Sequence, residues 1–389
     1  GGAAVIGEDG KAMLPTALQA LGTYAFRNCT SLTDLTIPSL TTNTSYSSST
    51  RPFNGCTSLA SITLGEGVTI GVPNYMFRDC SALTSVTLAE GIDTIGNYAF
   101  YGTGITSVAL PSTVESIGTY SFSNCSALAD ITFPASLETI GNYAFSGCSA
   151  LTAVDLSGTA LTEIGSNAFN GCSQITSFTV SASLTEIGSG AFNGCSALTE
   201  LELNEGLKTI GADAFLNTAI EAMQLPATVT SIGDNAFCQI AVTVADGSAG
   251  FISQDGVLLT SKGVVIATPP TMSGEYVVPE EVTQVGSYAL NGSSLTKVTL
   301  STDQLADYSF AYFTGEVVVT LGESTTIPAN AFSRYRGSSI TLPEGLTSIG
   351  ANAFSSCTGP ETLVLPSTVT SIGDNAFEES SFTTIELSA

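Results

Sequence analysis

Nine cysteines and 34 acidic residues are the side chains of this sequence that could do chemistry. The chain has no histidine, so it lacks the commonest general base and the commonest metal ligand, and no Ser-His-Asp or Cys-His nucleophile can be assembled. No glycine-rich phosphate loop ending in Gly-Lys-Ser or Gly-Lys-Thr occurs either. We therefore expect no catalytic residue, no metal site and no cofactor, in a protein that is not an enzyme.

The cysteines follow one spacing. Eight of the nine lie three residues after a phenylalanine, as Cys148 follows Phe145, and only Cys238 falls outside this register. A residue that recurs at one position of a repeat meets one kind of environment, so the spacing predicts a column of small buried thiols. Disulfides and zinc are disfavoured, because parallel side chains give poor disulfide geometry and no Cys-x-x-Cys pair is present.

Acidic residues recur where side chains should point away from the core. Asp130, Asp155, Glu200, Glu202 and Glu221 form what we call the acidic zone. Such carboxylates would attract a basic protein patch or hold calcium weakly, because hard cations prefer oxygen ligands. The alternative is an ordinary solvated strand face. The zone is the candidate ligand-binding site of the sequence.

Tyrosines form a second candidate site. Tyr98, Tyr120 and Tyr143 each stand two residues before a repeated phenylalanine in consecutive repeats, so we expect them to form an aromatic stripe. Half-buried packing with solvated hydroxyls explains such a stripe, and a platform for a sugar or a protein is the functional alternative.

A repeat of about 23 residues positions these side chains. Its first part is the motif Ile-Gly-x-x-Ala-Phe, and 14 of the 19 phenylalanines occupy its last position. Its second part is an apolar set spaced Leu-x-x-Val-x-Leu, whose final alternation of period two predicts a short strand. Proline often follows and ends that strand. One such unit cannot bury its apolar face alone, whereas stacked units can.

The two motifs together resemble the BspA-like family of bacterial leucine-rich repeat surface proteins. We predict an α/β repeat fold: a curved, right-handed leucine-rich-repeat solenoid of about 15 rungs, with parallel strands on its concave face. Residues 1–389 should form one solenoid, in which 1–237 and 286–389 are repeat arrays. Residues 238–285 interrupt the motif, and an Asp-Gly turn between apolar runs predicts an irregular rung with a β-hairpin there.

The charged-residue composition limits the classes of partner that the chain can bind. Nine basic residues against 34 acidic ones give a formal charge of −25, which excludes nucleic acid and anionic membranes as main partners. No apolar run is long enough to insert into a membrane. Residues Gly1–Gly7 lack the pattern of a signal peptide, which fits a secreted or cell-surface protein whose leader has been removed as well as it fits a cytosolic protein.

The resemblance implies a secreted or surface-attached protein, and some members of the family are implicated in adhesion to host matrix proteins. We interpret the chain as a non-enzymatic, adhesin-like protein-binding module that acts as a monomer. Its expected ligand is a protein, for example a host matrix glycoprotein. Two alternatives stay open: a structural spacer or stalk that presents another domain, and a carbohydrate-binding module.

Overall fold

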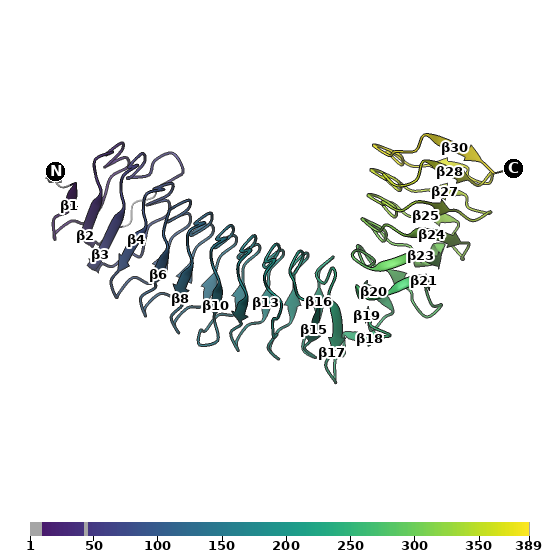
Figure 1. The fold of residues 1–389 in the computed structure, drawn as a ribbon, viewed down its shortest axis with the longest axis horizontal. Coiled ribbons are helices and arrows are strands. Elements are labelled where there is room, and N and C mark those ends of the chain that lie inside the picture. The colour runs from purple at the N-terminus through teal and green to yellow at the C-terminus, as the bar shows by residue number, and fades with distance from the viewer. Residues whose placement is uncertain (1–9, 43–45, 389) are drawn as a thin grey trace. The chain divides into compact units, whose positions relative to one another are not determined.

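The computed structural model describes residues 10–42 and 46–388. Short strands, stacked turn upon turn, build a parallel-strand β-solenoid of about 16 turns (Figure 1). Contacts divide the chain into two compact units, Gly1–Ile220 (unit 1) and Glu221–Ala389 (unit 2). The segment Gly1–Gly7, on which the expectation of a removed leader rests, lies outside the described residues.

Two sets of parallel strands run through unit 1. The Leu-x-x-Val-x-Leu motif forms the first ladder, which consists of β1 (Lys11–Met13), β2 (Asp34–Leu40), β3 (Ser61–Val68), β4 (Ser85–Leu88), β6 (Ser107–Ala109), β8 (Asp130–Thr132), β10 (Ala153–Asp155) and β12 (Ser177–Thr179). The Ile-Gly motif forms the second ladder, which consists of β5 (Thr94–Ile95), β7 (Ser116–Ile117), β9 (Thr139–Ile140), β11 (Glu163–Ile164), β13 (Glu186–Ile187) and β14 (Thr209–Ile210).

The two ladders differ in continuity. The second ladder is unbroken in unit 1, in the order β14-β13-β11-β9-β7-β5, with one isoleucine above the next at each step. The first ladder is divided into β1-β2-β3-β4, β6-β8 and β10-β12. The second ladder therefore links successive turns without a break where strand pairing in the first ladder is interrupted.

The motif phenylalanines form the core between the ladders. From Phe26 to Phe215 each ring stacks on the next, with ring centroids 5.2–6.0 Å apart. The cysteines three residues later are free thiols. The thiol of Cys148 lies 3.2 Å from the carbonyl oxygen of Phe122 in the preceding turn, and Cys172 and Cys195 repeat this contact. The expected column of structural thiols is present.

The α part of the predicted α/β class is not confirmed, because the described residues contain no α-helix. The reason lies in the backbone beside the motif phenylalanines, Phe53 excepted. Tyr98 and Gly102, two residues before and two after Phe100, have φ angles of 57° and 67°. This left-handed conformation interrupts a right-handed helix on both sides. The same pair of positions is left-handed around Phe26, Phe77, Phe122, Phe145, Phe169, Phe192, Phe215, Phe237, Leu290, Phe310, Phe332, Phe354 and Phe377.

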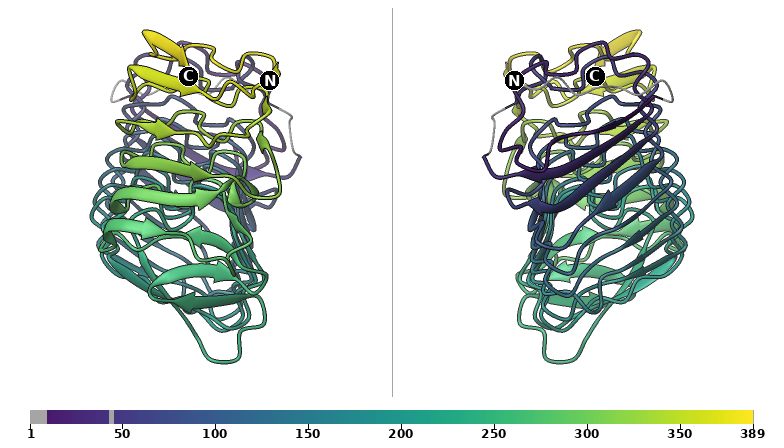
Figure 2. Two further views of the ribbon diagram at one scale, coloured as in Figure 1. Left: turned by 90° about the vertical axis from the view of Figure 1, so that its right-hand side faces the viewer. Right: turned by 90° about the vertical axis from the view of Figure 1, so that its left-hand side faces the viewer.

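Unit 2 contains similar turns and one irregular segment. Its elements are β15 (Ala222–Leu225), β16 (Ser231–Ile232), β17 (Ala241–Val244), β18 (Phe251–Gln254), β19 (Val257–Thr260), β20 (Val264–Ala267), β21 (Ser273–Val277), β22 (Gln284–Val285), β23 (Ser294–Ser301), the 3₁₀ helix η1 (Thr302–Gln304), β24 (Glu316–Thr320), β25 (Thr326–Ile327), β26 (Ile340–Thr341), β27 (Ser348–Ile349), β28 (Thr362–Leu365), β29 (Ser371–Ile372) and β30 (Thr384–Leu387). Strands β18, β19 and β20 pair antiparallel. Figure 2 shows the strands of the later turns layered one above the next.

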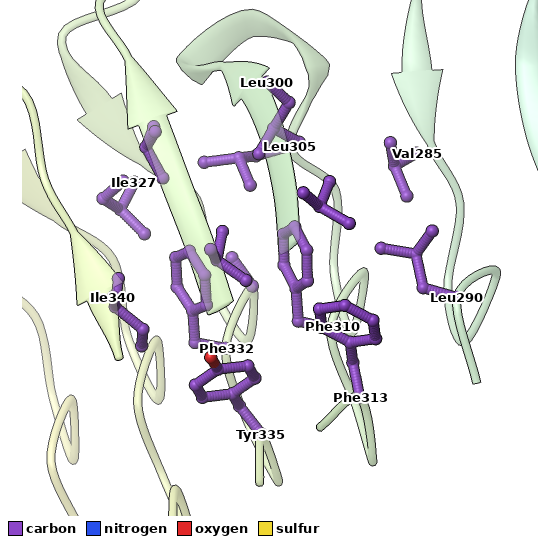
Figure 3. Close-up of a cluster of buried hydrophobic side chains, with 14 of the residues drawn as sticks. Val285, Leu290, Leu300, Leu305, Phe310, Phe313, Ile327, Phe332, Tyr335 and Ile340 are labelled. Carbon is purple, nitrogen blue, oxygen red and sulfur yellow. The ribbon is translucent and has the colours of Figure 1, made fainter. Parts of the chain in front are cut away.

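The core of unit 2 also contains stacked phenylalanines, but other aromatic side chains pack against this stack. Phe310 and Phe332 stack at 5.1 Å, and the buried Tyr335 packs edge-on against Phe332 (Figure 3). The Tyr335 hydroxyl lies 2.5 and 2.8 Å from the carbonyl oxygens of Gly315 and Ser339. Backbone acceptors therefore satisfy the one polar atom of this side chain.

The right-handed sense, the curvature and the concave position of the strands stay predictions. So does the organisation of residues 1–389 as one domain with two arrays.

Candidate functional site

An open groove lies where the first ladder of unit 1 ends at β12. The apolar spacing of Leu198, Leu201 and Leu203 predicts a strand beside β12, yet no strand forms over 198–203. In its place is a groove of about 470 Å³, which we call the β12 groove. One wall is residues 176–180 and the other is residues 200–204. Among the described strands, β12 pairs only with β10, and its other side borders the groove.

The floor of the β12 groove is apolar and fixed by packing. Phe178 and Leu201 line it and are 6% and 7% exposed. The Phe178 ring stands nearly perpendicular to those of Phe169 and Phe192, at centroid distances of 5.0 and 4.7 Å. Such edge-to-face contacts are favourable for aromatic rings, so the floor is held in one position.

The rim of the β12 groove is polar and negatively charged. Ser177, Thr179, Glu200 and Glu202 line it and are all exposed. No ion pair involving Glu200 or Glu202 occurs among the described residues. The groove thus combines a backbone strand edge, an apolar floor and two carboxylates without a counter-charge.

Asn204 also lines the groove. Its amide nitrogen donates to the carbonyl oxygens of Ala182 and Leu184, at 3.1 and 2.9 Å. The amide oxygen is buried and has no hydrogen-bond partner among the described residues. An unsatisfied buried acceptor is unusual in a folded protein. Nothing in the sequence pattern singles out this residue, because it follows the repeat motif without belonging to it.

The structure brings together part of the predicted acidic zone. Glu200 and Glu202 line the β12 groove, and Asp155 lies on the neighbouring strand with Thr179 as its register partner. Asp130 lies on β8, which pairs with β6 instead. Glu221 is an exposed residue at the start of unit 2.

Asp155 is held in its charged form. The backbone N–H of Ser157, which itself lines the groove, donates to the Asp155 carboxylate at 2.9 Å. The side chain and backbone of Ser157 lower the pKa of the Asp155 carboxyl, because hydrogen bonds to a carboxylate favour its ionised form. A third negative charge therefore stands beside the groove at neutral pH.

The predicted aromatic stripe is a continuous stack. Rings of Tyr98, Tyr120 and Tyr143 lie 4.7 and 4.6 Å apart, and Tyr75 extends the stack at 4.9 Å. The guanidinium of Arg78 lies 4.9 Å from the Tyr98 ring. Burial raises the pKa of the Tyr98 and Tyr120 hydroxyls, and the neighbouring phenols raise it further.

Stacking determines which parts of these rings a ligand can reach. Each ring inside the stack uses both faces on its neighbours, so its edge and hydroxyl remain for contact with solvent. A sugar binds an aromatic platform through the ring face. The stack therefore gives the packing interpretation a direct physical basis and leaves a sugar little surface to use.

The left-handed backbone explains which residue types recur at the tyrosine position of the repeat. From the sequence, this position was interpreted only in terms of side-chain packing. The tyrosine position becomes Asn167, Asp213 and Asn235 in later turns, and Gly190 in another. All four have positive φ angles. Asparagine, aspartate and glycine tolerate this conformation best, so their recurrence at one position was the available signal.

Metal binding and thiol reactivity at the described residues depend on how their side chains cluster and how deeply they are buried. Among the described residues, no group of three or more His, Cys, Asp or Glu side chains is placed to hold a metal ion. Burial raises the pKa of Cys56 to about 11 and of Cys80 to about 12. Both thiols are therefore protonated and weakly nucleophilic at neutral pH.

The repeat motif and the stacked turns can now be compared with known proteins. The model of the BspA type leucine rich repeat region matches in six copies, over residues 11–129, 115–243, 274–334 and 325–389. The chain belongs to this family. Membership confirms the resemblance seen in the sequence. Leucine-rich repeat proteins are a class of repeat proteins that typically bind other proteins.

One solved structure has a fold similar to that of this BspA-type chain, and a second is matched with a lower score. A leucine rich cell surface protein from Faecalibacterium prausnitzii is 21% identical, with a TM-score of 0.54, and the match covers 100% of this chain and 94% of that one. A leucine-rich repeat protein from Bacteroides ovatus is 19% identical, with a TM-score of 0.44 and coverage of 95% and 84%. At these identities the likeness concerns the fold.

No curated protein matches this BspA-type sequence. Within residues 10–42 and 46–388, the structure contains no helix with the length and apolar character needed to span a membrane.

Proposed function

We propose that the chain is a non-enzymatic protein-binding module, adhesin-like, that works outside the cell or on its surface. The observation that carries this proposal is the β12 groove, where an unpaired strand edge lies beside Glu200 and Glu202. The family and the name of the Faecalibacterium relative support the surface location. If the predicted curvature holds, the groove opens on the concave face.

The groove favours an extended, basic segment of a partner protein. A strand edge presents backbone donors and acceptors that an added strand can pair with, as in other β-augmentation complexes. The charged rim then selects lysine or arginine over acidic side chains, because complementary charge provides specificity. A matrix glycoprotein with an exposed basic segment is a partner of this kind.

A binding experiment tests the proposal. Purified protein is screened against matrix glycoproteins and a glycan panel at about 0.01 and 0.15 M salt, where the Debye length falls from roughly 30 to 8 Å. The Glu200→Gln/Glu202→Gln variant should bind its protein ligand roughly 5- to 30-fold more weakly, because each exposed charge pair contributes about 0.5–1 kcal/mol.

A matched control removes the same charge from the second ladder. Glu163 and Glu186 are exposed register partners on β11 and β13, so Glu163→Gln/Glu186→Gln changes the charge equally at another place in unit 1. This control should leave binding within about twofold. Equal losses in both variants would show that general charge, not the groove, governs binding. Silence across the panel would favour the spacer alternative, and hits confined to glycans would favour the carbohydrate alternative.

A further inference from the structure

The irregular segment of unit 2 encloses a second, smaller site. Hairpin β18–β19 and the segment around β21 surround a cavity of about 270 Å³. The hairpin turn is Asp255–Gly256, with φ angles of 52° and 82°. Two left-handed residues in succession are typical of a tight type I′ turn, for which Asp-Gly is a preferred pair. The turn therefore holds Asp255 in a defined place at the cavity.

The cavity walls are apolar and belong to the core. Val257, Leu259 and Val282 line it and are at most 4% exposed. Met272 and Tyr276 also line it, and both pack against the main hydrophobic cluster of unit 2. Because these walls are continuous with a packed core, the cavity is preformed.

Two carboxylates stand among these apolar walls. Asp255 and Glu281 line the cavity, both residues are exposed, and neither carboxylate has an ion pair or a side-chain hydrogen bond with the described residues. Burial raises the pKa of the Tyr276 hydroxyl, and the charges of Glu281 and Asp255 raise it further. Asp255, Glu281 and Tyr276 all line the same small volume.

The geometry points to a binding site for an ammonium group carried on an apolar stem, namely a lysine side chain of a partner protein or a free alkylamine. The stem replaces water against the apolar wall, and the ammonium meets two carboxylates and an aromatic ring. The volume is just below the roughly 300–1,000 Å³ of sites for drug-sized ligands, which suits one such side chain. This inference rests on unit 2 alone and is independent of the β12 groove.

Methionine methyl resonances provide a direct test. The chain has four methionines, and only Met272 lines the cavity. With ¹³C-methyl-labelled protein, n-hexylamine should shift the Met272 signal saturably and leave those of Met13, Met76 and Met223 in place. 1-Hexanol, which keeps the stem and lacks the charge, should bind at least about tenfold more weakly. Equal binding of amine and alcohol, or no selective shift at Met272, would overturn the inference.

Variants test the role of the carboxylates. Asp255→Asn/Glu281→Gln should abolish the preference for the amine, and asparagine retains the left-handed turn. Glu280→Gln is the control, since it neutralises an adjacent exposed carboxylate that does not line the cavity. If the double variant still prefers the amine, or the control loses the preference, the assignment is wrong.

A third probe separates the two sources of the ammonium. N-acetyl-lysine methylamide carries the lysine stem on a peptide-like backbone. If it binds as tightly as n-hexylamine, the site accepts a lysine of a protein, and if only n-hexylamine binds, the site takes a free amine. Either result supports an ammonium site in the cavity.

Discussion

The regular turns of unit 1 and the irregular segment of unit 2 differ in how their buried side chains pack. In the regular turns, one buried phenylalanine ring stacks directly on the next. Around residues 251–282, antiparallel strands replace a regular turn, and the packing leaves a cavity. The β12 groove likewise lies where an expected strand is missing. Both candidate sites therefore occur where the repeat is interrupted.

The largest expected effect tests how much the stacked phenylalanines of the regular turns contribute to the free energy of unfolding. Phe145 is fully buried, with Phe122 and Phe169 stacked on its two faces at 5.4 and 5.3 Å. Phe145→Ala should lower the free energy of unfolding by about 3–5 kcal/mol, through lost burial and the remaining cavity. Urea denaturation followed by circular dichroism measures this.

Leu290 is the counterpart of Phe145 beside the irregular segment. It is buried and places an aliphatic side chain at the phenylalanine position. Phe145→Leu should still cost about 1–3 kcal/mol, because two ring pairs of about 0.5–1.5 kcal/mol each are lost. A cost near zero would show that stacking contributes nothing beyond burial and would weaken the contrast between the two regions.

The next effect concerns the left-handed backbone, which both regions share. Asn167 has a φ angle of 56° in a regular turn, and Asp255 has one of 52° in the hairpin. Asn167→Val and Asp255→Val should each cost about 1–3 kcal/mol, since a β-branched residue is strained there. Thermal or urea unfolding measures both. The glycine variants Asn167→Gly and Asp255→Gly should cost far less, and equal costs for valine and glycine would refute backbone strain as the cause.

The smallest effect per residue is the pH dependence that each buried thiol of the column adds to stability. Unfolded thiols ionise near pH 8.5–9, whereas burial raises the pKa of Cys80 and Cys195 to about 12 in the folded protein. Above about pH 9 the unfolded state releases protons that the folded state keeps, so stability falls as pH rises. Each such thiol should cost about 1–2 kcal/mol at pH 10.

Unfolding titrations at pH 8 and pH 10 check this prediction. The Cys195→Ala variant should lose less stability over that interval than the unmodified protein. The half-buried Cys238 lies outside the regular register, so Cys238→Ala serves as the control. This control should alter the loss of stability between pH 8 and pH 10 less than Cys195→Ala does. An identical pH dependence in all three proteins would remove the thiol column as the cause.

The spacing of a few residue types predicted most of the architecture. Isoleucines such as Ile117 and Ile140 are paired in the second ladder, and the phenylalanines stack, because residues one repeat apart occupy equivalent places in successive turns. The α part of the predicted α/β class is not confirmed, because the described residues contain no α-helix. The recurring Tyr, Asn, Asp and Gly before Ala-Phe marked a left-handed residue, and that residue rules out a helix.

The candidate sites were harder to predict. The sequence identified Glu200 and Glu202 as acidic and exposed. The groove beside them exists because residues 198–203 form no strand, although their apolar spacing matches that of the neighbouring repeats. The cavity beside Tyr276 depends on how two chain segments meet across the hairpin. Periodicity in the sequence predicts positions that are equivalent from one turn to the next. Both candidate sites lie where one turn differs from its neighbours, so periodicity did not predict them.

The turn-to-turn bonding also has a mechanical consequence. Each turn is bonded to its immediate neighbours, by ladder hydrogen bonds and by contacts such as that of Cys148 with Phe122, so tension on the chain ends loads one junction after another. A released turn of about 23 residues extends to roughly 75 Å, compared with about 4.8 Å in the stack. Under a pull the protein would lengthen stepwise and dissipate work at every step, as an extensible tether does.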